Sequence, residues 1–426
     1  MLKRPETELT HNPIEETANY DPHKRVALAS GHKVWFEDDS KPYIDLIMGY
    51  SSANFGHANP NIQNFVIEAA SLYDNVVAFT STSRDHLDRQ LITYLEPGPN
   101  RLVYYPIGGS KTVDAAVKLA RAHTKKSGII SFKGGFHGYS FGAMLSTDEH
   151  FVNKKQFKPL PGESISFPFP DRKSTQSKLD ASSALSSLDD YLRSHQEDTA
   201  AVIFEPIQGA AGFISPPDGF LKDLISLINR YRVVSICDEI QTAVYRTGTF
   251  YNHTQSQLQP DIVLVGKSLA GGYYPLGALI ATQNFFESID LSAPGFDSTF
   301  SGNLFGIYIA NRTLEYAQKI SLEKTVKSNG DIMLHILNKL GHFPVVSSID
   351  GNGMALRFKL GYDNQDPQKN KGLAQKVREK AFDNHLIIQT AGIKGDYIKL
   401  SPSFFMSVDE FEEAISMLNK SIQEAI

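Results

Sequence analysis

Residues 200–272 hold three mostly apolar runs, each of which leads into a charged side chain. The stretch reads AAVIFEPIQGAAGF (200–213), then a helical pattern, then VVSICDEIQTAVYRTGTF (233–250) and PDIVLVGKSLAGG (260–272). The charged residues are Glu205, Asp238 and Lys267. Short apolar runs separated by helix-length segments predict parallel strands that are buried on both faces. Ligands bind beyond the carboxyl ends of such strands, so the three charged groups are candidates for one site.

Each of these residues also has an ordinary structural explanation. Lys267 could be a solvated lysine after a strand, because lone lysines are mostly exposed. Asp238 could cap the next helix, and Glu205 could pair with a nearby base. An acid, a second acid and a lysine at three successive strand ends favour a site over three unrelated coincidences.

Length and composition exclude several classes of protein. The chain has 426 residues, which is enough for a large core and predicts two domains. Its formal net charge of −5 does not indicate the excess of basic residues that is typical of nucleic-acid binding. The first residues, MLKRPETELTHNP, lack an apolar targeting segment, and no run approaches the length of a membrane span. We therefore expect a cytoplasmic protein with no nucleic-acid or membrane partner, and its single cysteine excludes an intrachain disulfide.

A second candidate site follows the strand expected at 102–106. The sequence IGGSKTVDAAVKLARAHT (107–124) predicts a glycine-rich turn that opens a helix. Unpaired N–H groups and the helix dipole favour an anion there. The turn contains G-S-K-T, but a P-loop needs glycine directly before the lysine, and here Ser110 precedes Lys111. The alternative around Lys267 needs a glycine at position 261, which is Asp261.

Four motifs in residues 200–272 resemble the class III pyridoxal-phosphate (PLP) aminotransferases. That family carries E-P-x-Q-G, D-E-x-Q-T, R-T-G and P-D-x-x-x-x-G-K-S-x-x-G-G, which match residues 205–209, 238–242, 246–248 and 260–272. The resemblance extends over most of the chain, from about residue 30 onward. It implies PLP as the cofactor and a Schiff base between PLP and Lys267. No metal ligands are expected, because His137 has no companion at ligand spacing.

The resemblance also implies roles for individual residues. Asp238 would hold the pyridine nitrogen protonated, and Lys267 would also move the substrate proton. Phe136 and Ile240 would pack against the ring, Gln241 would bond the ring hydroxyl, and Glu205 would support this network. The catalytic residues are then Lys267 and Asp238, and the cofactor would lie among Gly109, Ser110, Phe136, His137, Glu205, Asp238, Ile240, Gln241, Lys267 and Thr299.

The family fold is an α/β architecture, fold type I of the PLP-dependent transferases. It has a large domain with a mostly parallel central sheet flanked by helices, and a smaller α+β domain built from both chain ends. We expect residues 1–60 to join the small domain, 61–320 to form the PLP-binding domain and 321–426 to form the small domain. We expect the excursion at 157–191 to lie on the surface and to lead into a helix. Thr299, in the family's T-F-x-G-N, would reach the phosphate of a partner subunit, so a homodimer is expected.

The substrate side departs from the family pattern. Many relatives pair an acidic residue after E-P-x-Q-G with a C-terminal arginine, and here these positions are Ala210 and Lys399. Either glutamate is not bound in the usual way, or Lys399 does the arginine's work or lies exposed at a strand end. Tyr50 is expected to line the substrate pocket, and Tyr20 is either a pocket residue or an ordinary surface aromatic. Lys111 replaces the acidic residue of the usual phosphate turn.

The leading hypothesis is an enzyme that transfers an amino group between an amine or amino acid and a keto acid. The alternative on the same cofactor is an amino-acid racemase, epimerase or aminomutase, because the cofactor residues do not separate these reactions. A catalytically inert homologue that only binds is the third possibility, which intact Lys267 and Asp238 disfavour. An aminotransferase needs a keto acid to complete its turnover, whereas an isomerase does not.

Overall fold

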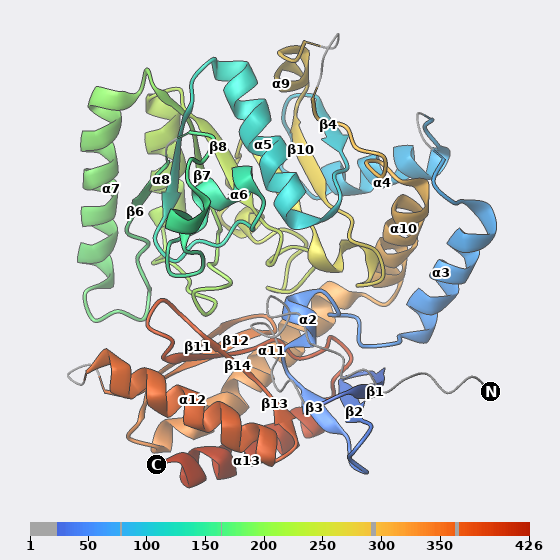
Figure 1. The fold of residues 1–426 in the computed structure, drawn as a ribbon, viewed down its shortest axis with the longest axis vertical. Coiled ribbons are helices and arrows are strands. Elements are labelled where there is room, and N and C mark those ends of the chain that lie inside the picture. The colour runs from blue at the N-terminus through green and yellow to red at the C-terminus, as the bar shows by residue number, and fades with distance from the viewer. Residues whose placement is uncertain (1–23, 77–78, 163, 291–294, 363–365) are drawn as a thin grey trace, which may run out of the picture.

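The computed structural model describes residues 24–76, 79–162, 164–290, 295–362 and 366–426. Its upper part in Figure 1 is built on a seven-stranded sheet with the order β4-β10-β9-β8-β7-β5-β6. The strands β5 to β9 run parallel, and β10 pairs antiparallel with both β9 and β4. The strands are β4 (Arg101–Tyr104), β5 (Gly128–Phe132), β6 (Ser164–Phe167), β7 (Thr199–Phe204), β8 (Val234–Asp238), β9 (Ile262–Val265) and β10 (Ala278–Thr282). The mostly parallel central sheet confirms the expected fold class.

Helices cover both faces of this sheet, as the apolar runs predict. Every residue of β7, β8 and β9 is buried. Alternate residues of β7 enter opposite cores: Ile203 packs with α5, whereas Val202 and Phe204 pack with α7 and α8. The helices of this part are α3 (Pro60–Leu72), α4 (Thr82–Thr93), α5 (Gly108–Thr124), α6 (Phe141–Ser146), α7 (Ser177–His195), α8 (Phe220–Arg230), α9 (Gln283–Glu287) and α10 (Leu304–Lys319).

The lower part of Figure 1 contains two four-stranded sheets. One has the order β11-β12-β15-β14, with β11 (Val346–Asn352), β12 (Ala355–Leu360), β14 (Gln389–Ala391) and β15 (Tyr397–Leu400). The other joins both ends of the chain, because β3 (Tyr43–Asp45) pairs with β13 (Leu386–Ile387) beside β1 (Val26–Ser30) and β2 (Lys33–Phe36). The helices here are α11 (Leu322–Leu337), α12 (Pro367–Asp383) and α13 (Val408–Ala425), and α2 (Met48–Ser51) lies between the two parts.

The strands β6 and β11 were not expected from the sequence. The excursion at 157–191 contains β6, which extends the large sheet beside β5 and so is not wholly a surface loop. Its run SISF is short and is followed directly by Pro168, so periodicity alone gives little signal. The strand β11 pairs with β12 although its buried face is partly polar.

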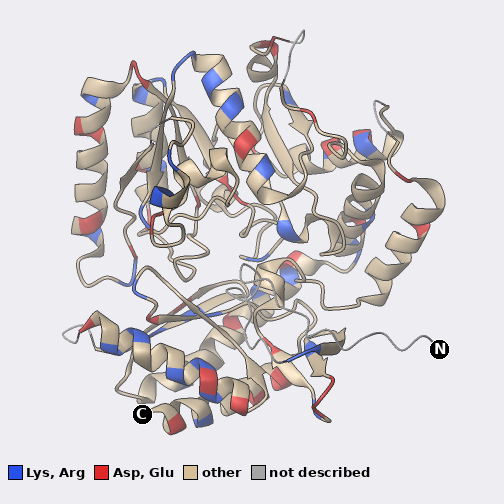
Figure 2. Ribbon diagram, viewed as in Figure 1, with Lys and Arg blue, Asp and Glu red and all other residues tan. Residues whose placement is uncertain are grey.

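Charge is distributed unevenly between two packed helices of the lower part. Figure 2 shows mainly basic residues on α12 and mainly acidic residues on α13. The two helices pack against each other. In the described part of the chain, no helix combines the length and apolar character needed to cross a bilayer.

Candidate active site

The carboxyl edge of the large sheet brings the three charged residues of the decisive stretch together. Glu205 follows β7, Asp238 ends β8, and Lys267 comes two residues after β9. Because these neighbouring strands are parallel, their carboxyl ends meet at one edge. The alternative of Asp238 as a helix cap is wrong, since the next helical element after β8 is the 3-10 turn His253–Ser256.

Asp238 is buried and is held by two donors. Its Oδ2 lies 2.7 Å from Nδ1 of His137, and its Oδ1 accepts from the backbone N–H of Ile240 at 3.0 Å. The side chain of His137 is itself 1% exposed, so the pair is shielded from water. A buried, hydrogen-bonded carboxylate of this kind is fixed in orientation.

Glu205 is buried beside Asp238 and serves the backbone on two sides. Its Oε1 accepts from the N–H of Phe136 at 3.0 Å and its Oε2 from the N–H of Gly209 at 2.8 Å. Burial raises the pKa of Glu205, the charge of His137 opposes that rise, and the charge of Asp238 adds to it. Glu205 therefore links the segment of Phe136 to the segment of Gly209.

Lys267 lies at the start of a single 3-10 turn, Lys267–Ala270, and its backbone has φ of +48°. Left-handed backbone at a lysine is costly and is typical of functional sites. Its Nζ has no hydrogen-bond or ion-pair partner among the described residues. Burial lowers the pKa of Lys267 to about 8, although Glu205 and Asp238 favour its charged form. The amine is thus more readily deprotonated than an ordinary lysine.

The glycine-rich turn at the start of α5 lies against Ile240. A Cβ on Gly109 would meet Cγ2 of Ile240 at 3.2 Å, so a larger residue there would require Ile240 to shift by a few tenths of an ångström. No side chain caps the helix, and the N–H groups of Gly109 and Ser110 have no acceptor among the described residues. Lys111 points outward, where its exposed amine lies 3.6 Å from Asp114.

Gln241 connects this edge to α2. Its Nε2 donates to the carbonyl of Tyr50 at 3.3 Å and to Oγ of Ser51 at 3.2 Å. The successive residues Met48, Gly49, Tyr50 and Ser51 all have positive φ, which makes α2 a left-handed turn. The side chain of Tyr50 is 52% exposed at the end of this strained segment.

Lys399 lies on β15, and it is 4% exposed. The possibility of an exposed strand end is therefore wrong. Its Nζ donates to the carbonyl of Gly209 at 3.2 Å and lies 5.1 Å from the ring centre of Phe213. Lys399 forms no ion pair with any described residue. Burial and, to a smaller extent, the charge of Lys267 lower its pKa to about 7, against the opposing charge of Glu205.

Two expected site residues lie apart from these contacts. Thr299 is exposed, and its carbonyl accepts from Nδ2 of Asn75 at 3.0 Å. Tyr20 lies outside the described residues.

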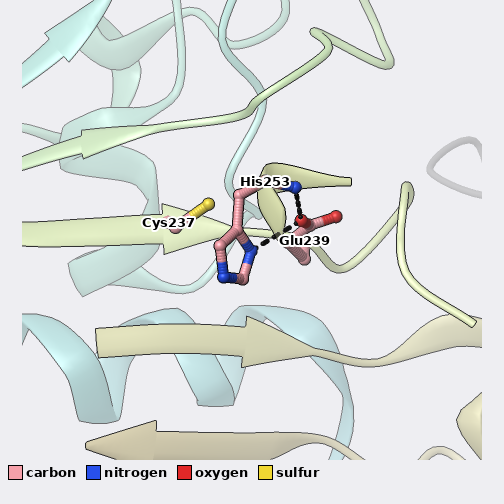
Figure 3. A group of neighbouring side chains, drawn as sticks. All are labelled: Cys237, Glu239 and His253. Atoms are coloured by element: carbon pink, nitrogen blue, oxygen red, sulfur yellow. Dashed lines mark hydrogen bonds and ion pairs between the residues drawn. The ribbon is translucent and has the colours of Figure 1, made fainter. Parts of the chain in front are cut away.

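A further buried group, Cys237, Glu239 and His253, has metal-ligand atoms within 4.8 Å of one another (Figure 3). Glu239 Oε1 accepts from the N–H of His253 at 2.7 Å and lies 2.9 Å from its Nδ1, while Oε2 accepts from Thr242. Both carboxylate oxygens are therefore engaged within the protein. These bonds connect the end of β8 to the turn at His253, and they fix the position of Glu239, the residue after Asp238.

Sequence reasoning missed a cluster of charges beside Lys399. Arg357 on β12 is 1% exposed and pairs with Asp171 and Asp350 at 2.6 and 3.2 Å. A lone arginine inside the apolar run ALRFKL was a usable signal, because a buried arginine needs a paired acid. Asp171 stands in the excursion, where we expected no chemistry.

Comparisons with known proteins agree with this geometry. The family model described as "Aminotransferase class-III" matches residues 17–422. The acetylornithine aminotransferase of Bacillus cereus is 28% identical over 395 residues, covering 92% of this chain and 93% of that protein. The alanine/serine racemase of Pyrococcus horikoshii is 25% identical over 410 residues, covering 93% and 85%.

Among solved structures, an (S)-enantioselective omega-transaminase from Thermomicrobium roseum superposes with a TM-score of 0.86 at 24% identity. The match covers 99% of this chain and 97% of that one, and it shows the shared fold. The family match extends over nearly the whole chain, including every strand end described above. The chain belongs to the class III aminotransferases, enzymes that depend on pyridoxal phosphate.

Proposed function

We propose that this aminotransferase takes its amino group from a donor that carries a carboxylate. Lys267 is the catalytic lysine, and Lys399 recognises the carboxylate. The observation that carries the proposal is the pair of buried lysines: one amine with no described partner beside two acids, and one cation with no acid of its own. A buried cation without a counter-ion is costly, so an anionic ligand gains by pairing with it.

The residues at the sheet edge fit the cofactor. The unpaired N–H groups of Gly109 and Ser110 suit its phosphate, and the fixed carboxylate of Asp238 suits its ring nitrogen. When bound, pyridoxal phosphate supplies an aldehyde that condenses with amines and a ring that withdraws electrons. Phe136 and Ile240 would hold the ring, and Gln241 would orient it from the side of Tyr50.

Each charged residue then has a separate task. Asp238, oriented by His137, would keep the proton on the ring nitrogen. Lys267 would hold the cofactor through its amine, and the same amine would accept the proton from the substrate Cα. A lysine with its pKa near 8 is suited to both accepting and returning that proton at neutral pH. Glu205 would hold the backbone at Phe136 and Gly209 in place beside the ring.

The substrate end lies between Lys399 and Tyr50. Ala210 leaves Lys399 without the acidic neighbour found in many relatives, so its ammonium has only the carbonyl of Gly209 and the ring of Phe213. A substrate carboxylate is the natural partner for such a group. Tyr50, exposed on the left-handed turn, would line the pocket on the other side.

We also propose a homodimer in which Thr299 reaches the partner's phosphate site. Thr299 is exposed, and the neighbouring segments carry a group of exposed apolar side chains. These are Leu72, Val76, Phe79 and Phe300. Exposed apolar groups of this kind favour contact with another chain. The parts 1–60 and 321–426 would form one unit and 61–320 the other, with the active site between them.

An isomerase remains the second candidate, because one similar protein is an alanine/serine racemase. The two reactions separate when donors are added without a keto acid. A transferase changes the visible band of its cofactor once and stops, in a one-to-one ratio with enzyme. An isomerase keeps the band and converts the amino acid continuously.

The test uses Lys267→Ala beside Lys339→Ala, a lysine whose exposed amine pairs with Glu412 on the surface. We expect Lys267→Ala to lose the lysine-bound visible band and about 10⁴-fold of its rate, as for removal of a general base. Lys339→Ala should keep both. An unchanged band in Lys267→Ala would overturn the assignment.

A further inference from the structure

The side of the β11-β12-β15-β14 sheet that carries Lys399 also carries a row of charged residues. In the pairing of β12 with β15, Arg357 is directly opposite Lys399. Directly opposite residues of antiparallel strands share a face and interact. Tyr397 lies two residues before Lys399 on β15, so it points to the same side.

Arg357 is held mainly by Asp171. Its Nη1 and Nη2 donate to the two carboxylate oxygens of Asp171 at 2.9 and 2.6 Å, a bidentate arrangement. A third bond, from Nη2 to Asp350, is 3.2 Å long. The carboxylate of Asp350 is already shared, because it also accepts from Arg172 at 2.6 Å. Asp171 is therefore the principal counter-ion of Arg357.

Asp171 also fixes Tyr397. The hydroxyl of Tyr397 donates to Oδ2 of Asp171 at 3.2 Å, and the guanidinium of Arg357 lies 5.1 Å from the Tyr397 ring centre. Burial alone would raise the pKa of Asp171, but the bonds and charge of Arg357 hold it below its ordinary value. The carboxylate thus stays charged and bridges two side chains that flank Lys399.

The backbone that Lys399 bonds rests on the same cluster. Gly212 has φ of +105°, and a Cβ there would meet Cβ of Tyr397 at 3.1 Å. Three residues earlier, the carbonyl of Gly209 accepts from Lys399. The 209–212 segment therefore packs on Tyr397 at one end and is bonded by Lys399 at the other.

We infer that Asp171 is a positioning residue for substrate selection: through Arg357 and Tyr397 it fixes Lys399, and it neutralises the cation beside it. The inference rests on the proposed role of Lys399. Without the Asp171 carboxylate, two arginines would share Asp350, and the excess positive charge would disfavour the ammonium form of Lys399. The charges of Lys267 and Glu205 act on Lys399. On the sheet, Arg357 is directly opposite Lys399 and Tyr397 lies two residues before it, and Asp171 and Asp350 pair with Arg357.

The experiment compares the holoenzyme with Asp171→Asn and Asp189→Asn. Asp189 is a matched control, because it also accepts from arginines and a tyrosine, but on α7 away from the site. Each amino acid is assayed beside the amine that lacks only its α-carboxylate, such as L-alanine with ethylamine and L-ornithine with putrescine. The dissociation constant of propionate, an unreactive carboxylate, is measured from pH 6 to 9.

We expect Asp171→Asn to lower kcat/KM about tenfold for amino acids and to spare the amines, a coupling typical of neighbouring charges. The loss should appear in KM, with kcat little changed. Propionate binding should weaken, and the pH at which it is lost should fall by roughly one unit. Asp189→Asn should match the wild type, and Asp171→Glu should recover much of the selectivity.

Equal losses for amino acids and amines would overturn the inference, since they indicate a role in folding alone. If Asp171→Asn does not retain the cofactor, Tyr397→Phe, which removes the hydroxyl that donates to Asp171, is compared with the wild type in the same assays. Lys399→Ala separates the two proposals. If Lys399→Ala lowers kcat/KM for amino acids but not for amines, while Asp171→Asn behaves like the wild type, only the inference about Asp171 is overturned. If Lys399→Ala shows no such selective loss, the proposed function is overturned.

Discussion

Buried charged groups are paired differently at the carboxyl edge of the large sheet and on the side of the small sheet that carries Lys399. At the large sheet, Asp238 and Glu205 each accept from two donors supplied by the chain. At the small sheet, Arg357 is paired with acids, but among the described residues Lys399 beside it has only a carbonyl oxygen and the ring of Phe213. The two acids of the first region are hydrogen-bonded within the protein, whereas the buried amine of Lys399 in the second region has no acidic partner among the described residues.

We relate this difference to the two ligands of the proposed site, the cofactor and the substrate. The cofactor is the same in every turnover, so the groups that orient it are best held rigidly by neighbouring side chains. In the proposed function the substrate enters and leaves, and its carboxylate would supply the negative charge that pairs with Lys399. Left-handed backbone occurs in both regions, at Lys267 and in the turn at 48–51.

The largest effect is expected at the cofactor end, from Asp238→Asn. The amide cannot carry the charge that holds a proton on the ring nitrogen, so kcat should fall about 10³-fold for every donor, amine and amino acid alike. Steady-state kinetics with several donors measures it. Asp190→Asn, at an exposed surface position, is the control. If kcat fell for amino acids alone, Asp238 would act on the substrate and not on the cofactor, which contradicts the separate roles of the two regions.

A smaller effect is expected from the left-handed turn. Gly49→Ala places a Cβ 2.6 Å from Oγ of Ser52 at a φ of +58°. We expect a loss of about 1–2 kcal/mol in the free energy of unfolding, the cost of left-handed backbone for a residue with a Cβ. Urea unfolding of the holoenzyme measures it.

The matched control for that change has the opposite sign. Gly372 lies inside α12, and a Cβ there meets nothing within 4 Å. Gly372→Ala should therefore stabilise the protein by roughly 0.5–1 kcal/mol. Equal stability of the two variants would show that the turn at 48–51 stores no strain.

The cofactor end could be predicted from the sequence because its signals are local. Apolar runs mark β7, β8 and β9 within two residues at each end, and Glu205, Asp238 and Lys267 stand at or within two residues of their carboxyl ends. The large sheet and its mostly parallel order follow from the same pattern. The short β6 escaped because proline and serine surround it.

The substrate end could not be predicted in the same way, because tertiary contacts decide it. The run YIKL gives no sign that Lys399 is buried, since burial comes from the 209–213 segment that packs over it. The left-handed turn contains one glycine, and its other residues are held by Gln241 and Ser401. The bond between Asp171 and Arg357 joins residues 186 positions apart.

The most direct test of the account is the ratio of kcat/KM for an amino acid to that for its decarboxylated amine, measured from pH 6 to 9 in wild type and Lys399→Ala. The pKa of Lys399 is lowered to about 7, so its ammonium form is present below that pH and is lost above it. The wild-type ratio should therefore be constant below pH 7 and fall about tenfold per pH unit above it. Titration of Lys267 affects both donors and cancels in the ratio. Lys399→Ala should give a low ratio at every pH. A wild-type ratio that Lys399→Ala retains, or that rises with pH, would contradict carboxylate recognition by Lys399.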